Sequence, residues 1–258
     1  HFAWDLGLWL GYANDPLVIY TREANGDRNR IGSLVNDRIG AGLVGAIALF
    51  DWAQLGFELP FVLVQRRGDA LVTGTTIPSL TGAGLGDLRI VPKIRILKQE
   101  KNGLSLAIIP MFTLPTGSKN NYFGDDDPTF SPMLALSKTW DTVRVGANLG
   151  YTFKNDVDVL DLEITDEIFL NAGPGFQFGK LGVDVTFGLT TSAENLFQAA
   201  NQTYGELLGS AKYELDYVIP FIGAGVGIIR GYGTPDYRLF LGARFNGGRS
   251  AESDGDGI

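Results

Sequence analysis

Apolar and polar residues alternate along most of this chain. In the segment DLRIVPKIRI, from Asp87 to Ile96, every second residue is apolar and most of the others are charged. A period of two is typical of a β-strand, because successive side chains on a strand point to opposite faces. One face of this strand therefore prefers an apolar environment, and the other face carries three cations.

The same alternation recurs, and no segment has a convincing helical period. It predicts twelve strands, at 6–12, 39–49, 55–63, 88–96, 104–112, 130–136, 143–151, 168–176, 183–189, 207–215, 218–228 and 237–245. Closed barrels of bacterial outer membranes are built from an even number of antiparallel strands. In a soluble sandwich the apolar face would be buried, whereas in such a barrel it meets lipid and the charges point into the lumen.

The connections alternate in length. Five short turns have the sequences FDWAQ, KQEKNG, KTWDT, FGKLG and ELDY. The long polar connections between them are 14–32, 68–86, 115–128, 154–166 and 192–201, with a shorter one at 231–236. Short periplasmic turns and long extracellular loops are the layout of outer-membrane barrels. This parity predicts that both ends of the barrel domain lie on the periplasmic side.

Aromatic residues gather beside the short turns and at the ends of the barrel. They are Trp4, Trp52, Trp140, Phe178, Tyr213, Tyr217 and Phe245. Amphipathic rings favour the level of the lipid headgroups, so this set predicts an aromatic girdle at the periplasmic interface. The alternative is that aromatics next to turns only staple the hairpins together.

The other face of the strands is mostly polar or glycine, which is unlike the core of a soluble protein. By the alternation, eight basic residues face the lumen: Arg38, Arg89, Lys93, Arg95, Arg144, Lys212, Arg238 and Arg244. Seven acidic residues share that face: Asp5, Glu58, Asp87, Glu167, Asp184, Glu206 and Glu214. The near balance predicts ion pairs across a crowded interior, because an unpaired charge in a confined space is costly. The alternative is a solute path lined by the basic stripe of Arg89, Lys93 and Arg95.

Composition excludes several other classes of protein. The net charge of −8 over 258 residues argues against a nucleic-acid partner. Cysteine is absent, so there is neither a disulfide framework nor a thiolate metal site. No apolar stretch reaches the roughly 18–20 residues of a membrane helix. The only histidine is His1, which leaves no general base on the barrel, so we expect no catalysis and no cofactor. Because the chain starts at His1 without Met, we also expect a cleaved signal peptide before it.

Acidic loops raise the question of a metal. Asp125–Asp127 form one acidic cluster, and Asp156, Asp158, Asp161 and Glu163 form another. Oxygen clusters of this kind bind Ca²⁺ or bridge to divalent ions at the lipopolysaccharide surface, but solvated loop charge is the simpler interpretation. In SDGDGI at the C-terminus, Asp254 and Asp256 alternate as Ca²⁺ ligands do, although six residues are too few for a full site.

Two families share phrases with this chain. The stretch GLGDLRIVPKIRIL (84–97), followed by LSLAIIPMFTLPTGS (104–118), resembles outer-membrane channel proteins of the phenol-degradation meta-pathway type. The start GLWLGYANDPL and the end SAESDGDGI resemble the barrel domain of OmpA-type proteins. In that family an Asp-rich thrombospondin type 3 repeat leads to a periplasmic peptidoglycan-binding domain, of which this chain contains nothing.

The sequence therefore predicts an all-β, transmembrane, antiparallel up-and-down barrel of twelve strands with periplasmic termini. We expect the barrel to span 1–246 and an Asp/Gly-rich linker to begin at 247–258. The resemblance to OmpA implies a membrane anchor, with a plugged lumen, that links the outer membrane to peptidoglycan through the missing domain. The alternative is a passive channel for small solutes, aromatic ones among them. Lipid and lipopolysaccharide of the bacterial outer membrane are the expected partners.

Overall fold

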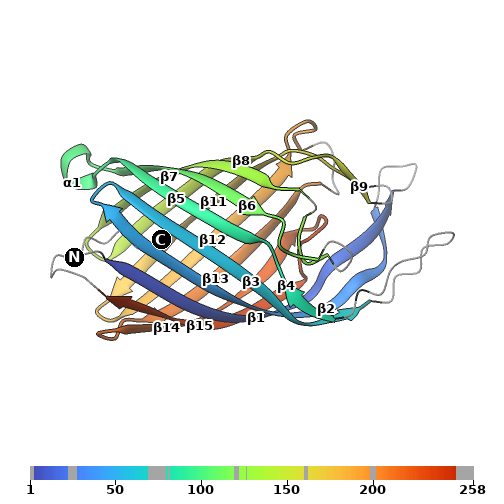
Figure 1. The fold of residues 1–258 in the computed structure, drawn as a ribbon, viewed down its shortest axis with the longest axis horizontal. Helices are drawn as coiled ribbons and strands as arrows, with labels where there is room; N and C mark the ends of the chain where they lie inside the picture. Colours follow the sequence, from blue (N-terminus) through green and yellow to red (C-terminus); the bar gives the residue numbers. More distant parts are fainter. Residues whose placement is uncertain are drawn as a thin grey trace.

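The chain folds into a closed β-barrel (Figure 1). The computed structural model describes residues 3–22, 28–68, 80, 82–118, 122–125, 127–159, 162–197 and 202–247. Twelve long strands form the wall: β1 (Trp4–Arg22), β2 (Arg28–Phe50), β3 (Ala53–Arg67), β5 (Leu88–Leu97), β6 (Ser105–Leu114), β7 (Thr129–Trp140), β8 (Val143–Thr152), β11 (Glu167–Phe178), β12 (Leu181–Ser192), β13 (Tyr204–Tyr213), β14 (Val218–Ile229) and β15 (Tyr237–Gly247). Each pairs antiparallel with its neighbours, and β1 pairs with both β2 and β15. This last pairing closes the barrel and confirms the predicted fold class.

Three short strands and one short helix lie outside the set of twelve wall strands in the described part of the chain. Strand β4 (Gly82–Leu85) pairs with the upper part of β3, and β9 (Val157–Val159) and β10 (Leu162–Ile164) form a separate hairpin in a long connection. The helix α1 (Gln99–Asn102) occupies the turn KQEKNG. Gly103 ends it with φ +76°, a left-handed conformation that glycine adopts without strain. This single turn of helix is one difference from the predicted all-strand chain.

The connection 14–32 is also shorter than predicted. Strands β1 and β2 continue their pairing as far as Arg22 and Arg28, with register irregularities between Asn14 and Leu17 and again near Tyr20. The backbone hydrogen bonds between these strands extend beyond the residues with apolar alternation, because backbone pairing does not require an apolar face. No helix in the part of the chain that the structure describes is long and apolar enough to cross a membrane.

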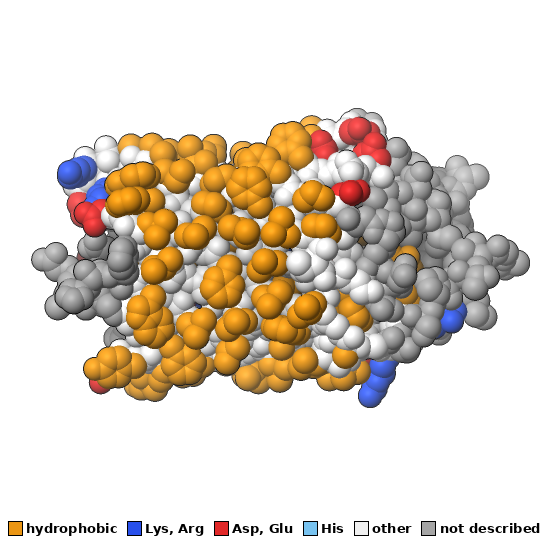
Figure 2. All heavy atoms as spheres, viewed as in Figure 1, with side chains coloured by type: hydrophobic (Ala, Val, Ile, Leu, Met, Phe, Trp, Pro, Cys, Tyr) orange, Lys and Arg blue, Asp and Glu red, His pale blue; other side chains and the backbone are white. Residues whose placement is uncertain are grey.

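The side chains on the outer surface are apolar and exposed. Leu8, Leu149 and Leu241 keep 56, 53 and 52% of their surface exposed, whereas the neighbouring positions on the same strands are half-buried or buried. Figure 2 shows the result on one face of the barrel as a broad apolar band, with the charged side chains of that face near its two ends. Exposed apolar area of this extent marks contact with lipid. The apolar face therefore lies outside and the polar face lines the lumen, as the alternation predicts.

Aromatic residues border this band. All seven predicted girdle residues are exposed: Trp4 47%, Trp52 54%, Trp140 50%, Phe178 59%, Tyr213 47%, Tyr217 78% and Phe245 41%. A second outward group, which the sequence reasoning missed, lies at the other end of the strands: Tyr12, Tyr237, Phe112, Phe130 and Phe153. Phe130 and Trp140 are ten residues apart on β7, or about 34 Å of strand. At a tilt of about 40° this spans about 26 Å, close to the apolar band of outer-membrane barrels.

The register between the first and last strands differs from the one that matching Trp4 with Phe245 predicts. Trp4 lies opposite Gly247, and Asp5 lies opposite Asn246 instead of Arg244, a slip of two residues. Because the slip is even, Asp5 still faces the lumen. The physical reason is steric, since the Trp4 ring occupies the place where a side chain at Gly247 would be. Both strand ends lie beside the short turns (Figure 1).

Candidate functional site: the barrel lumen

Most of the predicted lumen charges are brought together in pairs. The shortest distances between the charged groups are Arg244–Asp5 2.7 Å, Arg238–Glu206 2.7 Å, Arg89–Glu58 2.9 Å, Lys212–Glu214 3.7 Å and Arg144–Asp184 3.9 Å. Arg244–Asp5 and Arg89–Glu58 join neighbouring strands, whereas Arg238–Glu206 and Arg144–Asp184 each reach across one intervening strand, β14 and β11 respectively. Lys212 pairs with Glu214 in the turn after its own strand, β13. The pairs therefore follow the wall and do not span the lumen.

The basic stripe on β5 lies beside a cavity. Arg89 donates to Glu58 on the next strand, and Arg95 donates to the backbone carbonyl of Asp51 in the turn between β2 and β3. Lys93 and Arg95 line a cavity of about 260 Å³ together with Arg144 and Asp184. Three cations and one carboxylate therefore give this part of the lumen a net positive lining.

The rest of that cavity combines polar groups and glycines with apolar residues such as Leu106, Ile109 and Leu136. Asn148, Asn171 and Thr186 contribute amide and hydroxyl groups, and Gly146 is among the glycines that line it. A side chain at Gly146 would find only a backbone oxygen, at 3.9 Å. This wall, formed by β5 to β12, therefore has open space beside hydrogen-bonding groups. Such convergence of polar groups on a concavity is typical of a solute site.

Asp87, one of the predicted lumen acids, holds a loop in place. Its carboxylate accepts hydrogen bonds from the backbone N–H groups of Gly117 and Asp125, at 2.8 and 2.7 Å. Next to it the side chain of Phe123 is buried against Gly84. These contacts hold segment 122–125 at the ends of β3 to β5 that adjoin the long connections. Asp87 therefore positions this loop, because the backbone N–H groups of the loop donate to both of its carboxylate oxygens.

Arg38 fastens the same segment from the other side. It donates to the side-chain oxygen of Gln65 at 2.8 Å and to the backbone carbonyl of Tyr122 at 2.9 Å. Gln65 in turn donates to the carbonyl of Leu80 at 2.7 Å. Leu80 is fully buried against Val35. The sequence did not predict where the long connections lie. The described parts of two of them, Leu80 and segment 122–125, are therefore held against β2 and β3 by Arg38 and Gln65.

Glu167 forms hydrogen bonds with a second set of side chains, at the end of the barrel that carries the long connections. It accepts from Lys154 at 2.7 Å and from the hydroxyl of Tyr232, and Tyr204 lies 3.5 Å away. Burial, together with the charge of Glu167, raises the pKa of the Tyr232 hydroxyl, which therefore stays a proton donor. Glu167 and Asp87 thus organise a mouth cluster: Asp87, Asp125, Lys154, Glu167 and Tyr232.

Aromatic rings line part of the lumen, on the strands that also carry the Arg244–Asp5 and Arg238–Glu206 pairs. Trp9, Phe221 and Phe240 lie half-buried on the inner faces of β1, β14 and β15. Each ring covers a glycine of a neighbouring strand: a Cβ at Gly42 would lie 2.2 Å from Trp9, and one at Gly223 would lie 2.2 Å from Phe240. Phe169 covers Gly150 in the same way on β8. The signal was in the sequence, where inward aromatics alternate with inward glycines.

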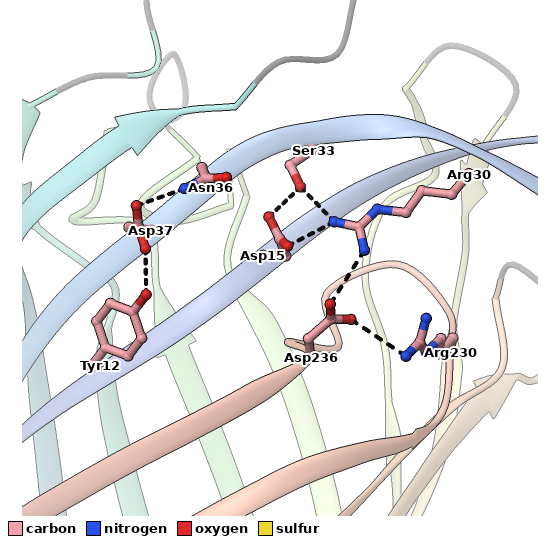
Figure 3. A network of polar contacts seen from close by, with 8 residues as sticks. All are labelled: Tyr12, Asp15, Arg30, Ser33, Asn36, Asp37, Arg230 and Asp236. Atoms are coloured by element: carbon pink, nitrogen blue, oxygen red, sulfur yellow. Dashed lines mark hydrogen bonds and ion pairs between the residues drawn. The ribbon is translucent and has the colours of Figure 1, made fainter.

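Outside the lumen, a polar network ties the long-loop ends of β1, β2 and β15 together (Figure 3). Arg30 lies 2.7 Å from Asp15 and 3.2 Å from Asp236, so it bridges the first hairpin to the last loop. On the outer rim Tyr12 donates to Asp37. This network reinforces the junction where the barrel closes.

Metal binding finds no support in the described residues. No group of three or more His, Asp or Glu side chains is placed to hold an ion there. Asp254 and Asp256, Asp126, and the side chains of 157–164 lie outside what the structure describes, as does His1.

Comparison with known proteins agrees with the barrel. A family model described as the putative MetA-pathway of phenol degradation matches residues 20–213. An outer-membrane channel from Pseudomonas putida F1 has a similar structure, with a TM-score of 0.67, 15% identity and 95% of each chain covered. The NanC porin has a TM-score of 0.62 and 10% identity, over 93% of this chain and 98% of that one. At these identities the likeness shows the fold alone. A search of curated proteins found no significant match.

These findings place the protein in the bacterial outer membrane and favour one of the two resemblances. Neither the family match nor the similar structures support an OmpA-type domain, a thrombospondin repeat or a link to peptidoglycan. The phrases at 84–97 and 104–118 that resemble the channel family lie inside the matched region. Because that match covers about three quarters of the 258 residues, this chain belongs to the family described as the putative MetA-pathway of phenol degradation.

Proposed function

We propose that this protein is a passive channel for small solutes across the outer membrane. The observation that carries the proposal is the cavity of about 260 Å³ inside the barrel, lined by charged and amide side chains. A barrel that serves only as an anchor has no need of such a space. Membership of a family that resembles outer-membrane channels supports the same function.

The positions of the charged side chains in the lumen also leave room for a solute to pass. Because the ion pairs run along the wall between strands that are adjacent or one strand apart, they leave the centre of the lumen to solvent and solutes. The mouth cluster narrows one end, since it fastens segment 122–125 over β3 to β5. We therefore expect a narrow channel with small conductance, unlike a wide porin.

Conductance of the purified barrel in planar lipid bilayers tests this function. We expect discrete, small current steps in KCl, and larger steps for Lys93→Ala or Arg95→Ala, which shorten side chains that line the cavity. Leu241→Ala, on the lipid face, is the matched control and should leave the steps unchanged. Bilayers that stay insulating with correctly folded protein would disprove the channel and return the barrel to an anchoring role.

A further inference from the structure

A row of small residues creates the cavity in the lumen. Ser105 on β6 lies opposite Ser137 on β7, which in turn lies opposite Gly146 on β8. Gly146 lies opposite Gly173 on β11, and all four residues line the cavity. Because these residues extend only a short way from the backbone, the four adjacent strands leave open the space of about 260 Å³ in front of them.

Three long cationic side chains border this row. Lys93 and Arg95 line the cavity from β5, the strand next to β6, and Arg95 lies opposite Ala107. Arg144 lines it from β8, two residues before Gly146. Residues two apart on a strand point to the same face and are separated by about 6.8 Å. The cations therefore border the row of small residues along one edge and at one end.

The excess positive charge of the lumen is concentrated at this cavity. Outside it, the inward cations of β5, β13 and β15 each lie 2.7–3.7 Å from a carboxylate. The cavity lining instead combines three cations with a single carboxylate, that of Asp184, which is 3.9 Å from Arg144. A concave site lined mainly by one sign of charge concentrates ions of the opposite sign, so this part of the lumen attracts anions.

The neutral groups of the lining suit an anion with several oxygens. Asn148 and Asn171 lie directly opposite each other on β8 and β11, and their amides can donate from the wall that faces Lys93. Guanidinium, ammonium, amide and hydroxyl donors that converge from several strands match an oxyanion better than a chloride ion, because each oxygen accepts its own hydrogen bonds. The carboxylate of Asp184 accepts a hydrogen bond from a phosphate that keeps a proton, whereas it only repels sulfate.

From this arrangement we propose that the cavity is a binding site for small oxyanions of the phosphate type, and that it makes the channel selective for anions. The inference rests on the proposed channel function and names its solute class. It assigns Lys93, Arg95 and Arg144 as anion-binding residues, and Asp184 as the acceptor that distinguishes phosphate from sulfate.

Current measurements in planar bilayers test the inference. In a KCl gradient, the reversal potential should show that Cl⁻ permeates about threefold better than K⁺ through the wild-type barrel. Potassium phosphate at neutral pH, added at constant KCl, should then reduce the conductance about twofold, because an ion bound in the path delays the others. Potassium sulfate at the same ionic strength should reduce it less.

Substitutions in the lining should change these two readings separately. Lys93→Gln and Arg95→Gln remove a charge but keep a long side chain, so each should lower the preference for Cl⁻ and weaken the effect of phosphate. Asp184→Asn removes the carboxylate and keeps the shape of the side chain. It should raise the preference for Cl⁻ and let sulfate reduce the conductance as strongly as phosphate, which a merely structural role of Asp184 would not produce.

The matched control is Lys138→Gln. Lys138 is exposed on β7 and lies 5.3 Å from the centre of the Trp140 ring in the girdle, so removing its charge should leave both readings unchanged. The slow migration of unheated, folded barrel in gel electrophoresis verifies that each variant is folded. If a variant does not fold, the wild-type readings still decide the matter.

Two results would overturn the inference in different ways. A wild-type barrel with normal KCl conductance that does not favour Cl⁻, or on which phosphate acts no more strongly than sulfate, would overturn the oxyanion site and leave the channel intact. Absence of any KCl conductance from folded protein would overturn both proposals.

Discussion

Arg244 on β15 and Asp5 on β1 join the last strand of the barrel to the first through two hydrogen bonds, of 2.7 and 3.2 Å. The two residues are not directly opposite, since Arg244 faces Gly7 in the register of the two strands. The guanidinium therefore reaches diagonally across the seam, over a glycine that leaves room for it. Both side chains are partly shielded, with 30 and 24% of their surface exposed.

This seam pair should stabilise barrel closure. In a double-mutant cycle with Asp5→Ala and Arg244→Ala, we expect a coupling free energy of about 1 kcal/mol, since a partly shielded, two-bond pair exceeds the usual value for exposed pairs. Urea titration of the barrel in lipid vesicles measures it. Asp216→Ala is the control, because Asp216 and Lys180 are exposed and 3.9 Å apart. A coupling indistinguishable from zero would show that the seam pair adds nothing.

Depth in the membrane should set the cost of a charge on the outer face. Leu241 lies midway between the two girdle residues Tyr237 and Phe245 and is 52% exposed. Leu241→Arg should destabilise the barrel by about 2–4 kcal/mol, whereas Trp52→Arg at the interface should cost about 0–1 kcal/mol from the lipid contribution. Unfolding titrations in vesicles of one lipid composition compare them. Equal costs would contradict the lipid-facing assignment.

Glycines beneath the lumen rings should resist substitution. A Cβ at Gly223 would lie 2.2 Å from the Phe240 ring, so Gly223→Ala should destabilise the barrel by about 1–3 kcal/mol through overpacking. Gly146→Ala is the matched control, because its Cβ meets only a backbone oxygen at 3.9 Å. The difference in unfolding free energy between the two variants is the measurement. If both are tolerated alike, the rings are not seated as described.

The contacts of the mouth cluster should restrict the motion of the loops that they join. Tyr232→Phe removes the hydroxyl that donates to Glu167, and Glu167→Gln also removes the charge that pairs with Lys154. Loosening these contacts should increase current fluctuations in planar bilayers, with Glu167→Gln more affected than Tyr232→Phe. Thr142→Ala, in the short turn at the opposite end, is the control and should leave the noise unchanged. Currents as quiet as those of the unmutated barrel would show that the cluster does not control the path.

Local pattern was enough to predict the strands, their number and the inside-out arrangement. Alternation over a strand such as Leu88–Leu97 depends only on the backbone period of two, and the apolar set is too regular for any environment but lipid. The girdle aromatics follow from the same reasoning, since their position beside short turns is readable along the chain. Short phrases within 84–118 carried the resemblance to the channel family, but the sequence alone favoured the OmpA-type anchor, which the family match and the similar structures do not support.

Only the closed tertiary structure determined which side chains contact each other in the lumen. Register across the seam slipped by two residues because Trp4 requires the space above Gly247, a contact between the two ends of the chain. Asp87 accepts hydrogen bonds from backbone amides of a loop, and the path of that loop is not described by any alternation along the chain. Side-chain period determines which face a residue takes, but which residues meet across a barrel depends on closure, register and loop packing.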